Sequence, residues 1–280
     1  MTTRPLPVLP AGACDCHMHV FDSRYPFAPG AQPVPPAPME QYLAVQSLMG
    51  TTRTVVVAPS SYGLDNRSTL DGLAALGAEG RAVVSLAPGA TDAELAELHA
   101  AGVRGVRLNL ARGQSTPFDT LASIARRIAP LGWHVQLMLT PQQLVAHGDA
   151  LAVVGVSLVI DHMARIPQDG GVDSPAYTVL RRLVDAGNTW VKLSLASSAQ
   201  LLGTSREEVL HTLGRQLVVS STGRLVWGSD WPHVLSTLEG TPQPADEDML
   251  ALLLDWASAE AQRREILADT PAALYGFAAV

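Results

Sequence analysis

The sequence has few cysteines, one lysine and no long apolar run, and these shortages exclude several classes of protein. Only two cysteines occur in 280 residues, too few for a fold that depends on disulfides. No apolar stretch reaches the roughly 18 residues that a transmembrane helix requires. The segment 1–13 is rich in proline and lacks the apolar core of a secretory signal peptide. These absences lead us to expect a cytoplasmic protein.

The spacing of the cysteines and the net charge argue against further kinds of site and partner. Cys14 and Cys16 are separated by one residue in a predicted strand, so both side chains point to the same side. This spacing is poor for a disulfide and offers no further ligands for a zinc site, so we expect two buried thiols. The formal net charge of -7 at pH 7 argues against nucleic acid or an anionic membrane surface as a partner.

What the sequence does contain is an alternation of short apolar segments with helical ones. With 47% hydrophobic residues, the 280-residue chain can bury one large core, and single-domain α/β barrels commonly have this length. Eight short runs rich in β-branched residues predict strands at 15–20, 54–58, 82–86, 105–109, 133–139, 156–161, 189–193 and 225–228. Segments with helical spacing lie at 39–49, 68–78, 92–101, 118–129, 141–151, 175–186, 205–218, 246–256 and 260–268.

This alternation predicts the fold class. Near-continuous apolar strands joined by helices are typical of a parallel sheet covered on both faces. Eight such units in a chain of this length favour a closed (β/α)8 TIM barrel, with residues 1–280 forming a single α/β domain. The segment 21–38 is rich in proline, alanine and glycine. We interpret it as a long first βα loop that folds over the mouth of the barrel.

Polar side chains occur where the predicted strands end. His17 and His19 are two residues apart in an extended segment, so both rings point to one face. His162 and Asp230 follow the sixth and eighth strands. A single histidine at a strand end is more often a structural hydrogen-bond partner than a catalyst. A larger set is hard to explain by packing, since burying each member has a cost; the other members are Ser60, Arg107, Asn109, Gln136, Lys192 and Ser194.

The order of these residues resembles that of the amidohydrolase superfamily. Its barrels carry His-x-His on the first strand, histidine on the sixth and aspartate on the eighth. More narrowly, the sequence is similar to the branch that contains 2-pyrone-4,6-dicarboxylate lactonase and related lactone-processing enzymes. The similar segments are 15–22, 58–66, 105–109, 161–163, 227–233 and the closing 270–277. The resemblance therefore extends over nearly the whole chain, and it implies the barrel fold and an active site at the carboxyl ends of the strands.

The resemblance also bears on metal binding. In metal-dependent members, a lysine or glutamate on the fourth strand or a histidine on the fifth completes the metal site. Here the fourth strand offers Arg107 and Asn109, the fifth offers Gln136, and His134 lies near the start of its strand. A guanidinium close to the histidine pair would repel a divalent cation. We therefore predict no metal and no cofactor; the alternative is a divalent-metal hydrolase or decarboxylase that binds the ion through His17, His19 and Asp230.

The activity that the resemblance implies is hydrolysis of a carboxylate-bearing lactone. Asp230 is expected to be the general base that activates water. The donors of hydrogen bonds to the substrate carbonyl oxygen are expected to be His17, His19 and His162. Arg107 is expected to bind the substrate carboxylate, because a planar guanidinium matches it. The full set of expected substrate contacts is Ser60, Arg107, Asn109, Arg112, Gln136 and Lys192, although a salt-bridge role for Lys192 is equally compatible with the sequence.

The sequence departs from this branch where the substrate would be held. The resemblance implies an arginine after the seventh strand and a tyrosine near the end of the fifth. Here residues 194–199 contain no arginine, and Met138 stands on the fifth strand. The expected small-molecule substrate is therefore a monocarboxylate or sugar-acid lactone. A lactone isomerase and a non-catalytic binding barrel are the remaining alternatives, and the oligomeric state is left open.

Overall fold

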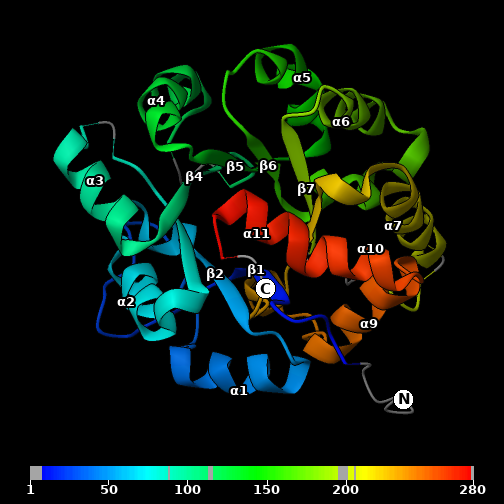
Figure 1. The fold of residues 1–280 in the computed structure, drawn as a ribbon, viewed down its shortest axis with the longest axis horizontal. Coiled ribbons are helices and arrows are strands. Elements are labelled where there is room, and N and C mark those ends of the chain that lie inside the picture. Colours follow the sequence, from blue (N-terminus) through cyan, green and yellow to red (C-terminus); the bar gives the residue numbers. More distant parts are fainter. Residues whose placement is uncertain (1–7, 88, 113–115, 195–200, 205, 279–280) are drawn as a thin grey trace.

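Eight parallel strands, each paired with the next along the chain, form the centre of the molecule. The computed structural model describes residues 8–87, 89–112, 116–194, 201–204 and 206–278. The strands are β1 (Cys14–Met18), β2 (Arg53–Val57), β3 (Gly80–Val84), β4 (Val103–Asn109), β5 (His134–Met138), β6 (Leu158–Ile160), β7 (Thr189–Leu193) and β8 (Leu225–Trp227). The predicted (β/α)8 barrel is confirmed (Figure 1).

Backbone hydrogen bonds close the barrel between β1 and the segment that follows β8. The Asp230 amide donates to the carbonyl oxygen of His17 at 2.8 Å. The His19 amide donates to the carbonyl oxygen of Trp231 at 2.9 Å. Closure therefore brings the aspartate that follows the last strand next to the two histidines of the first.

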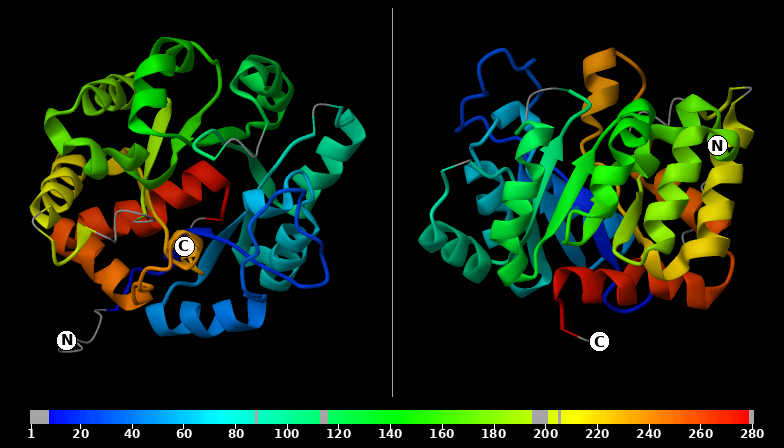
Figure 2. Two further views of the ribbon diagram at one scale, coloured as in Figure 1. Left: turned by 180° about the vertical axis from the view of Figure 1, so that it is seen from behind. Right: turned by 90° about the horizontal axis from the view of Figure 1, so that it is seen from above.

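Helices surround the barrel (Figures 1 and 2). Those that separate the strands or follow the last one are α1 (Met39–Met49), α2 (Arg67–Leu76), α3 (Asp92–Ala101), α4 (Leu121–Ile128), α5 (Pro141–Ala152), α6 (Pro175–Asp185), α7 (Glu207–Ser221), α8 (Val234–Glu239), α9 (Asp246–Trp256), α10 (Glu260–Arg264) and α11 (Thr270–Tyr275). The predicted bounds of α1, α3 and α9 agree with the structure. No helix in the described ranges combines the length and apolarity that a membrane span requires.

The predicted helices at 118–129 and 260–268 differ from the structure in their detail. The segment predicted at 118–129 begins as a 3₁₀ turn, continues as α4 and ends in a second 3₁₀ turn at Ala129–Leu131. Pro130 lies in that last turn, and proline cannot donate the backbone hydrogen bond that an α-helix would need there. The segment predicted at 260–268 divides into α10 and a π-helical turn at Glu265–Asp269. Helix α8 was not expected, since six residues are too few to show helical periodicity.

The two ends of the barrel have different contents. At the amino-terminal end, α11 lies across the opening (Figure 2), and Tyr275 and Phe277 pack against Cys14 and Cys16 inside it. Both cysteines are buried and unpaired, as predicted. Helix α8 stands over the carboxyl end, and the loop 21–38 lies to one side of it, near α2 (Figure 2). Because side chains fill the floor, the carboxyl end is where a ligand can enter.

The loop 21–38 is anchored to the neighbouring elements. Phe21 and Ala37 exchange backbone hydrogen bonds of 3.0 and 2.8 Å across its base. Arg24 and Tyr25 both donate to the carboxylate of Asp71 on α2, at 2.8 and 2.6 Å. These contacts hold the loop against α2. Phe21 is the residue of this loop that lines the cavity at the barrel mouth.

Candidate active site

An irregularity in β1 sets the direction of its polar side chains. The pairing register with β2 shifts between Asp15 and Met18, as at a β-bulge. The Asp15 carboxylate accepts hydrogen bonds from Tyr42 Oη on α1 at 3.0 Å and from Ser229 Oγ at 2.6 Å. It also accepts from the backbone amides of His17 and Ser229, both at 3.0 Å. Asp15 thus ties β1 to the segment after β8, a role that no sequence pattern indicated.

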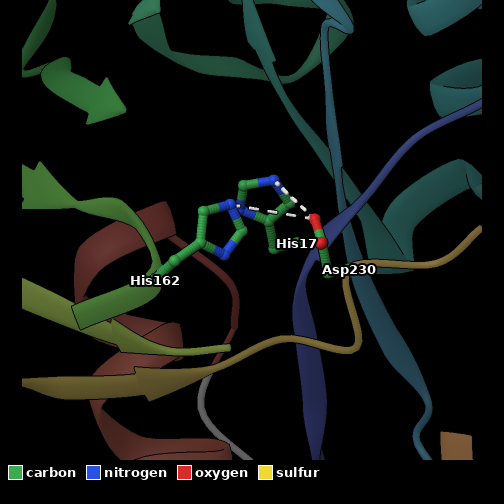
Figure 3. Close-up of side chains that lie close together, drawn as sticks. All are labelled: His17, His162 and Asp230. Atoms are coloured by element: carbon green, nitrogen blue, oxygen red, sulfur yellow. Dashed lines mark ion pairs between the residues drawn. The ribbon is translucent and has the colours of Figure 1, made fainter. Parts of the chain in front are cut away.

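The predicted catalytic residues meet at the barrel mouth, around one oxygen atom of Asp230. The Nε2 atoms of His17 and His162 lie 3.6 and 3.8 Å from Asp230 Oδ1 (Figure 3). His19 Nε2 lies 3.9 Å from the same oxygen. All four side chains are buried. Asp230 itself has a left-handed backbone conformation, with φ of 65°, which non-glycine residues rarely adopt and which often marks functional sites.

His162 is held by an unusual backbone segment. Four consecutive residues, His162 to Arg165, have φ between 51° and 56° and form a left-handed turn directly after β6. Each such residue costs about 1–2 kcal/mol relative to a right-handed conformation. The imidazole Nδ1 lies 2.8 Å from Ser194 Oγ. The turn and this contact direct Nε2 of His162 toward Asp230.

A cavity lined by both polar and apolar side chains lies above the cluster. About 430 Å³ of unfilled space lies there, open solvent included. His19, His162 and Asp230 form its base. The polar lining residues, together called the polar wall, are Ser60, Ser61, Arg107, Asn109 and Arg112; the apolar lining residues are Phe21, Pro59, Met138, Val234 and Leu235.

Arginine side chains give the polar wall its positive charge. Arg107 Nη1 donates to the carbonyl oxygen of Ala58 at 3.0 Å, and its Nε lies 3.4 Å from Asp161 Oδ2. Burial lowers the pKa of Arg112, and Arg107 and Arg165 lower it further. Arg165, the last residue of the left-handed turn, is therefore a third cation near this wall. Sequence patterns did not indicate it, because they do not signal such a turn.

Burial controls protonation in the cluster. It raises the pKa of Asp230 above its ordinary value and lowers the pKa of His162. The pKa of His17 is lowered well below its usual range, first by burial and then by the charge of Lys192. Burial and Arg107 together lower the pKa of His19 to about 3. At neutral pH, the site therefore contains neutral imidazoles beside a carboxylate of raised basicity.

Lys192 and Gln136 lie beneath the cavity instead of lining it. Lys192 is fully buried, and its Nζ donates to the carbonyl oxygen of Cys16 at 2.8 Å and to Gln136 Oε1 at 2.7 Å. The same Nζ lies 3.3 Å from His17 Nδ1. The expected role of both residues as substrate contacts thus has no support from this placement. The alternation of side chains along a strand correctly predicted that both residues point into the barrel, but it did not predict that they lie below the cavity.

Asp161 is a further buried group that the sequence indicated only as the neighbour of His162. Its Oδ1 lies 3.7 Å from Lys192 Nζ. Burial alone would raise the pKa of this carboxyl, but the charges of Lys192 and Arg107 hold it well below its ordinary value. Asp161 therefore balances the buried positive charges below the cavity.

The remaining predicted contacts are partly described. Asn109 Nδ2 donates to Ser60 Oγ at 3.2 Å, which couples β4 to the turn after β2. Both residues line the cavity, and their role as substrate contacts stays a prediction. The segment 195–199, where the resemblance implied an arginine, lies outside the described residues.

Part of the cluster has a geometry that could hold a metal ion. One ligand atom from each of His17, His162 and Asp230 lies within 4.8 Å of the others, and two imidazoles with a carboxylate suit a divalent cation such as zinc. Against this, the Lys192 ammonium lies 3.3 Å from the His17 ring, and Arg107 is close enough to lower the pKa of His19. The donor set fits a metal, while the surrounding charge opposes one.

The approach of β8 to β1 depends on a glycine, which leads to a first prediction. A Cβ atom at Gly228 would lie 2.5 Å from His17 Cβ and 2.8 Å from its backbone nitrogen. We expect Gly228→Ala to separate His17 from Asp230, to lower turnover at least tenfold and to cost about 1–3 kcal/mol of stability. Thermal unfolding and kinetics measure both effects. Gly89→Ala, whose Cβ meets nothing within 4 Å, is the control; equal behaviour of the two variants would contradict the prediction.

Comparison with known proteins identifies the family of the chain. A sequence model of the Amidohydrolase family matches residues 14–277. The chain is 34% identical over 278 residues to 4-sulfomuconolactone hydrolase of Hydrogenophaga intermedia, covering 96% of this chain and 90% of that protein. It is 33% identical to 2-pyrone-4,6-dicarboxylate hydrolase of Comamonas testosteroni, covering 98% and 93%. The crystal structure of Agrobacterium tumefaciens ATU3138 superimposes with a TM-score of 0.88 at 27% identity, covering 99% and 100%.

Fold and site together define a (β/α)8 barrel with a histidine and aspartate cluster at its carboxyl end. The chain belongs to the amidohydrolase family. The family resemblance expected from the sequence motifs is thereby confirmed.

Proposed function

We propose that this protein is a hydrolase that opens a carboxylate-bearing lactone ring. The observation that carries the proposal is the position of Asp230, which lines the cavity with His162 and His19 directly beside the arginine wall. A water molecule at Asp230 would therefore lie next to a bound anionic ring. The relatives described above are named as hydrolases of a muconolactone and of a pyrone dicarboxylate, which supports the same class of reaction.

The proposed reaction uses Asp230 as the general base. Asp230 takes a proton from water while the water oxygen forms a bond to the lactone carbonyl carbon. An imidazole N–H of the cluster, with His162 at the cavity, stabilises the negative charge that builds on the carbonyl oxygen. The bond from this carbon to the ring oxygen then breaks, and Asp230 returns its proton to the leaving oxygen. The product is an open-chain acid.

The walls of the cavity set the proposed substrate class. Arg107 and Arg112 line one side and would bind a carboxylate, as guanidinium groups commonly do. Met138 is an apolar lining residue, paired with Asn109 on the neighbouring strand. We therefore propose a lactone with its carboxylate at the arginine wall and a less polar edge toward Met138.

A panel of lactones assayed by pH-stat tests the proposal. Ring opening forms a carboxylic acid that ionises and consumes titrant, so hydrolysis is expected to appear as alkali uptake. An isomerase would convert the lactone without titrant, and a binding protein would leave it unchanged. Anionic lactones are expected to react at least tenfold faster than their neutral esters, because only the anions engage the arginines.

We further propose that the site works without a metal ion. The buried charges balance already: Lys192 and Arg107 are opposed by Asp161 and Asp230. Adding a divalent cation would leave about two uncompensated positive charges in a buried site, which is costly. The second candidate, a metal-dependent hydrolase of the same family, is favoured by the geometry of His17, His162 and Asp230.

Metal analysis distinguishes the two candidates. The purified protein is expected to contain well under one equivalent of transition metal and to keep its activity after dialysis against a chelator. Adding zinc or manganese to the dialysed protein is expected to leave turnover unchanged. Loss of activity in chelator, with recovery on adding zinc, would establish the metal-dependent alternative.

A further inference from the structure

The hydrogen-bond partners of His17 and His19 indicate that their Nε2 atoms have opposite roles, one as donor and the other as acceptor. His19 Nδ1 lies 2.7 Å from the carbonyl oxygen of Val57. A carbonyl oxygen can only accept, so Nδ1 of His19 must carry a hydrogen. In a neutral imidazole only one nitrogen is protonated. Nε2 of His19, on the side of Asp230 and the cavity, is therefore a bare acceptor.

The adjacent contacts extend this reasoning to His17. The Nε2 atoms of His17 and His19 are 3.3 Å apart, and since that of His19 is bare, a hydrogen bond between them requires the His17 nitrogen to be the donor. Neutral His17 then has a bare Nδ1, which accepts from Lys192 Nζ at 3.3 Å. Asp161 Oδ1 lies equally close to this Nδ1, yet among the described residues it has no hydrogen-bond partner. That agrees with a His17 ring that bears no hydrogen at Nδ1.

We propose that His19 presents a hydrogen-bond acceptor to the cavity and that it shares the attacking water with Asp230. His19 Nε2 and Asp230 Oδ1 are 3.9 Å apart, and a water molecule can donate one hydrogen to each. With both hydrogens so engaged, a lone pair of the water oxygen is left to face a bound carbonyl carbon. A bare imidazole nitrogen has one lone pair, so the water replaces the long 3.3 Å contact from His17 as the hydrogen-bond donor to His19 Nε2.

This inference rests on the proposed lactone hydrolysis, and it changes one of the expected roles. His19 was expected to polarise the substrate carbonyl as a donor, but a bare nitrogen cannot stabilise negative charge on an oxygen. Among the three histidines, the carbonyl would instead be polarised by His162, which lines the cavity. His17 and Lys192 act from below as positioning residues, because the ammonium fixes which nitrogen of His17 carries the hydrogen.

Nitrogen NMR of histidine-labelled protein tests the assignment without any substrate. The protein is dialysed against chelator at neutral pH, and His17→Gln and His19→Gln variants assign the two rings. Bare and protonated ring nitrogens differ widely in chemical shift. We expect His19 to be protonated at Nδ1 and bare at Nε2, and His17 to show the reverse. A hydrogen on His19 Nε2 would overturn the inference.

A double-mutant cycle tests whether His19 and Asp230 act on the same water. His19→Leu alone is expected to lower kcat about tenfold to a hundredfold, but less than about threefold in an Asp230→Asn background, because groups that act as a unit are not additive. In the matched control cycle, His162 is mutated in place of His19. The loss of kcat caused by the His162 variant should be the same with Asp230 and with Asn at position 230. If the fold-losses of kcat for the His19 and Asp230 variants multiply in the double variant, the two residues do not share a water, and the proposal is wrong. An inactive protein with the expected tautomers would contradict the proposed hydrolysis, not the acceptor assignment.

Discussion

Asp230→Asn is expected to lower kcat by about two to four orders of magnitude, the usual contribution of a positioned proton acceptor. The amide preserves the shape of the side chain but has lost the basic oxygen around which His17, His162 and His19 converge. Burial raises the pKa of this carboxyl, so the wild-type group is a stronger base than an exposed aspartate. The loss should therefore appear in turnover at saturating substrate, with little change in KM.

The matched control for this variant is Asp248→Asn, an exposed carboxylate at the start of α9. It is expected to leave kcat unchanged. Circular dichroism and thermal unfolding establish that both variants are folded. Near-normal turnover of Asp230→Asn would assign the base to another group, and the imidazole of His19 would be the next candidate.

Replacing the cavity arginines is expected to raise KM instead. Arg112→Met removes a partly exposed guanidinium from the cavity wall. If it holds the substrate carboxylate equally in the ground and transition states, KM rises about tenfold to a hundredfold while kcat stays within about threefold. Steady-state kinetics on an anionic lactone measures both constants. Exposed Arg126 on α4 provides the control, as Arg126→Met.

Arg107→Met is expected to raise KM in the same way and also to destabilise the fold. Arg107 is buried and lies 3.4 Å from the carboxylate of Asp161. Removing one partner of a buried ion pair costs about 3–5 kcal/mol, reduced here because Lys192 remains near Asp161. A fall in the midpoint of thermal unfolding for Arg107→Met but not for Arg112→Met would separate the two roles. Loss of kcat at saturating substrate in a folded Arg107→Met protein would contradict its assignment as an anchor.

The sequence alone determined the architecture of this protein and the chemical character of its site. Alternating apolar runs and helical segments predicted the barrel, because each pattern reports a local periodicity that tertiary contacts rarely reverse. The period of two in a strand placed His17 and His19 on one face. The carboxyl-end rule for such barrels then predicted that they would meet His162 and Asp230.

Only the tertiary structure decided which inward residues reach the cavity. Lys192 and Gln136 have the correct parity but lie below it, because depth depends on the stagger between strands around the closed barrel, which is not a local property. The register shift in β1 turned Asp15 to Tyr42 and Ser229. The left-handed turn at His162 to Arg165 and the contact of His19 with Val57 also arise from long-range packing. A sequence determines residue types and periodicities. Which nitrogen of each imidazole carries the hydrogen depends on a hydrogen-bond partner from a distant part of the chain.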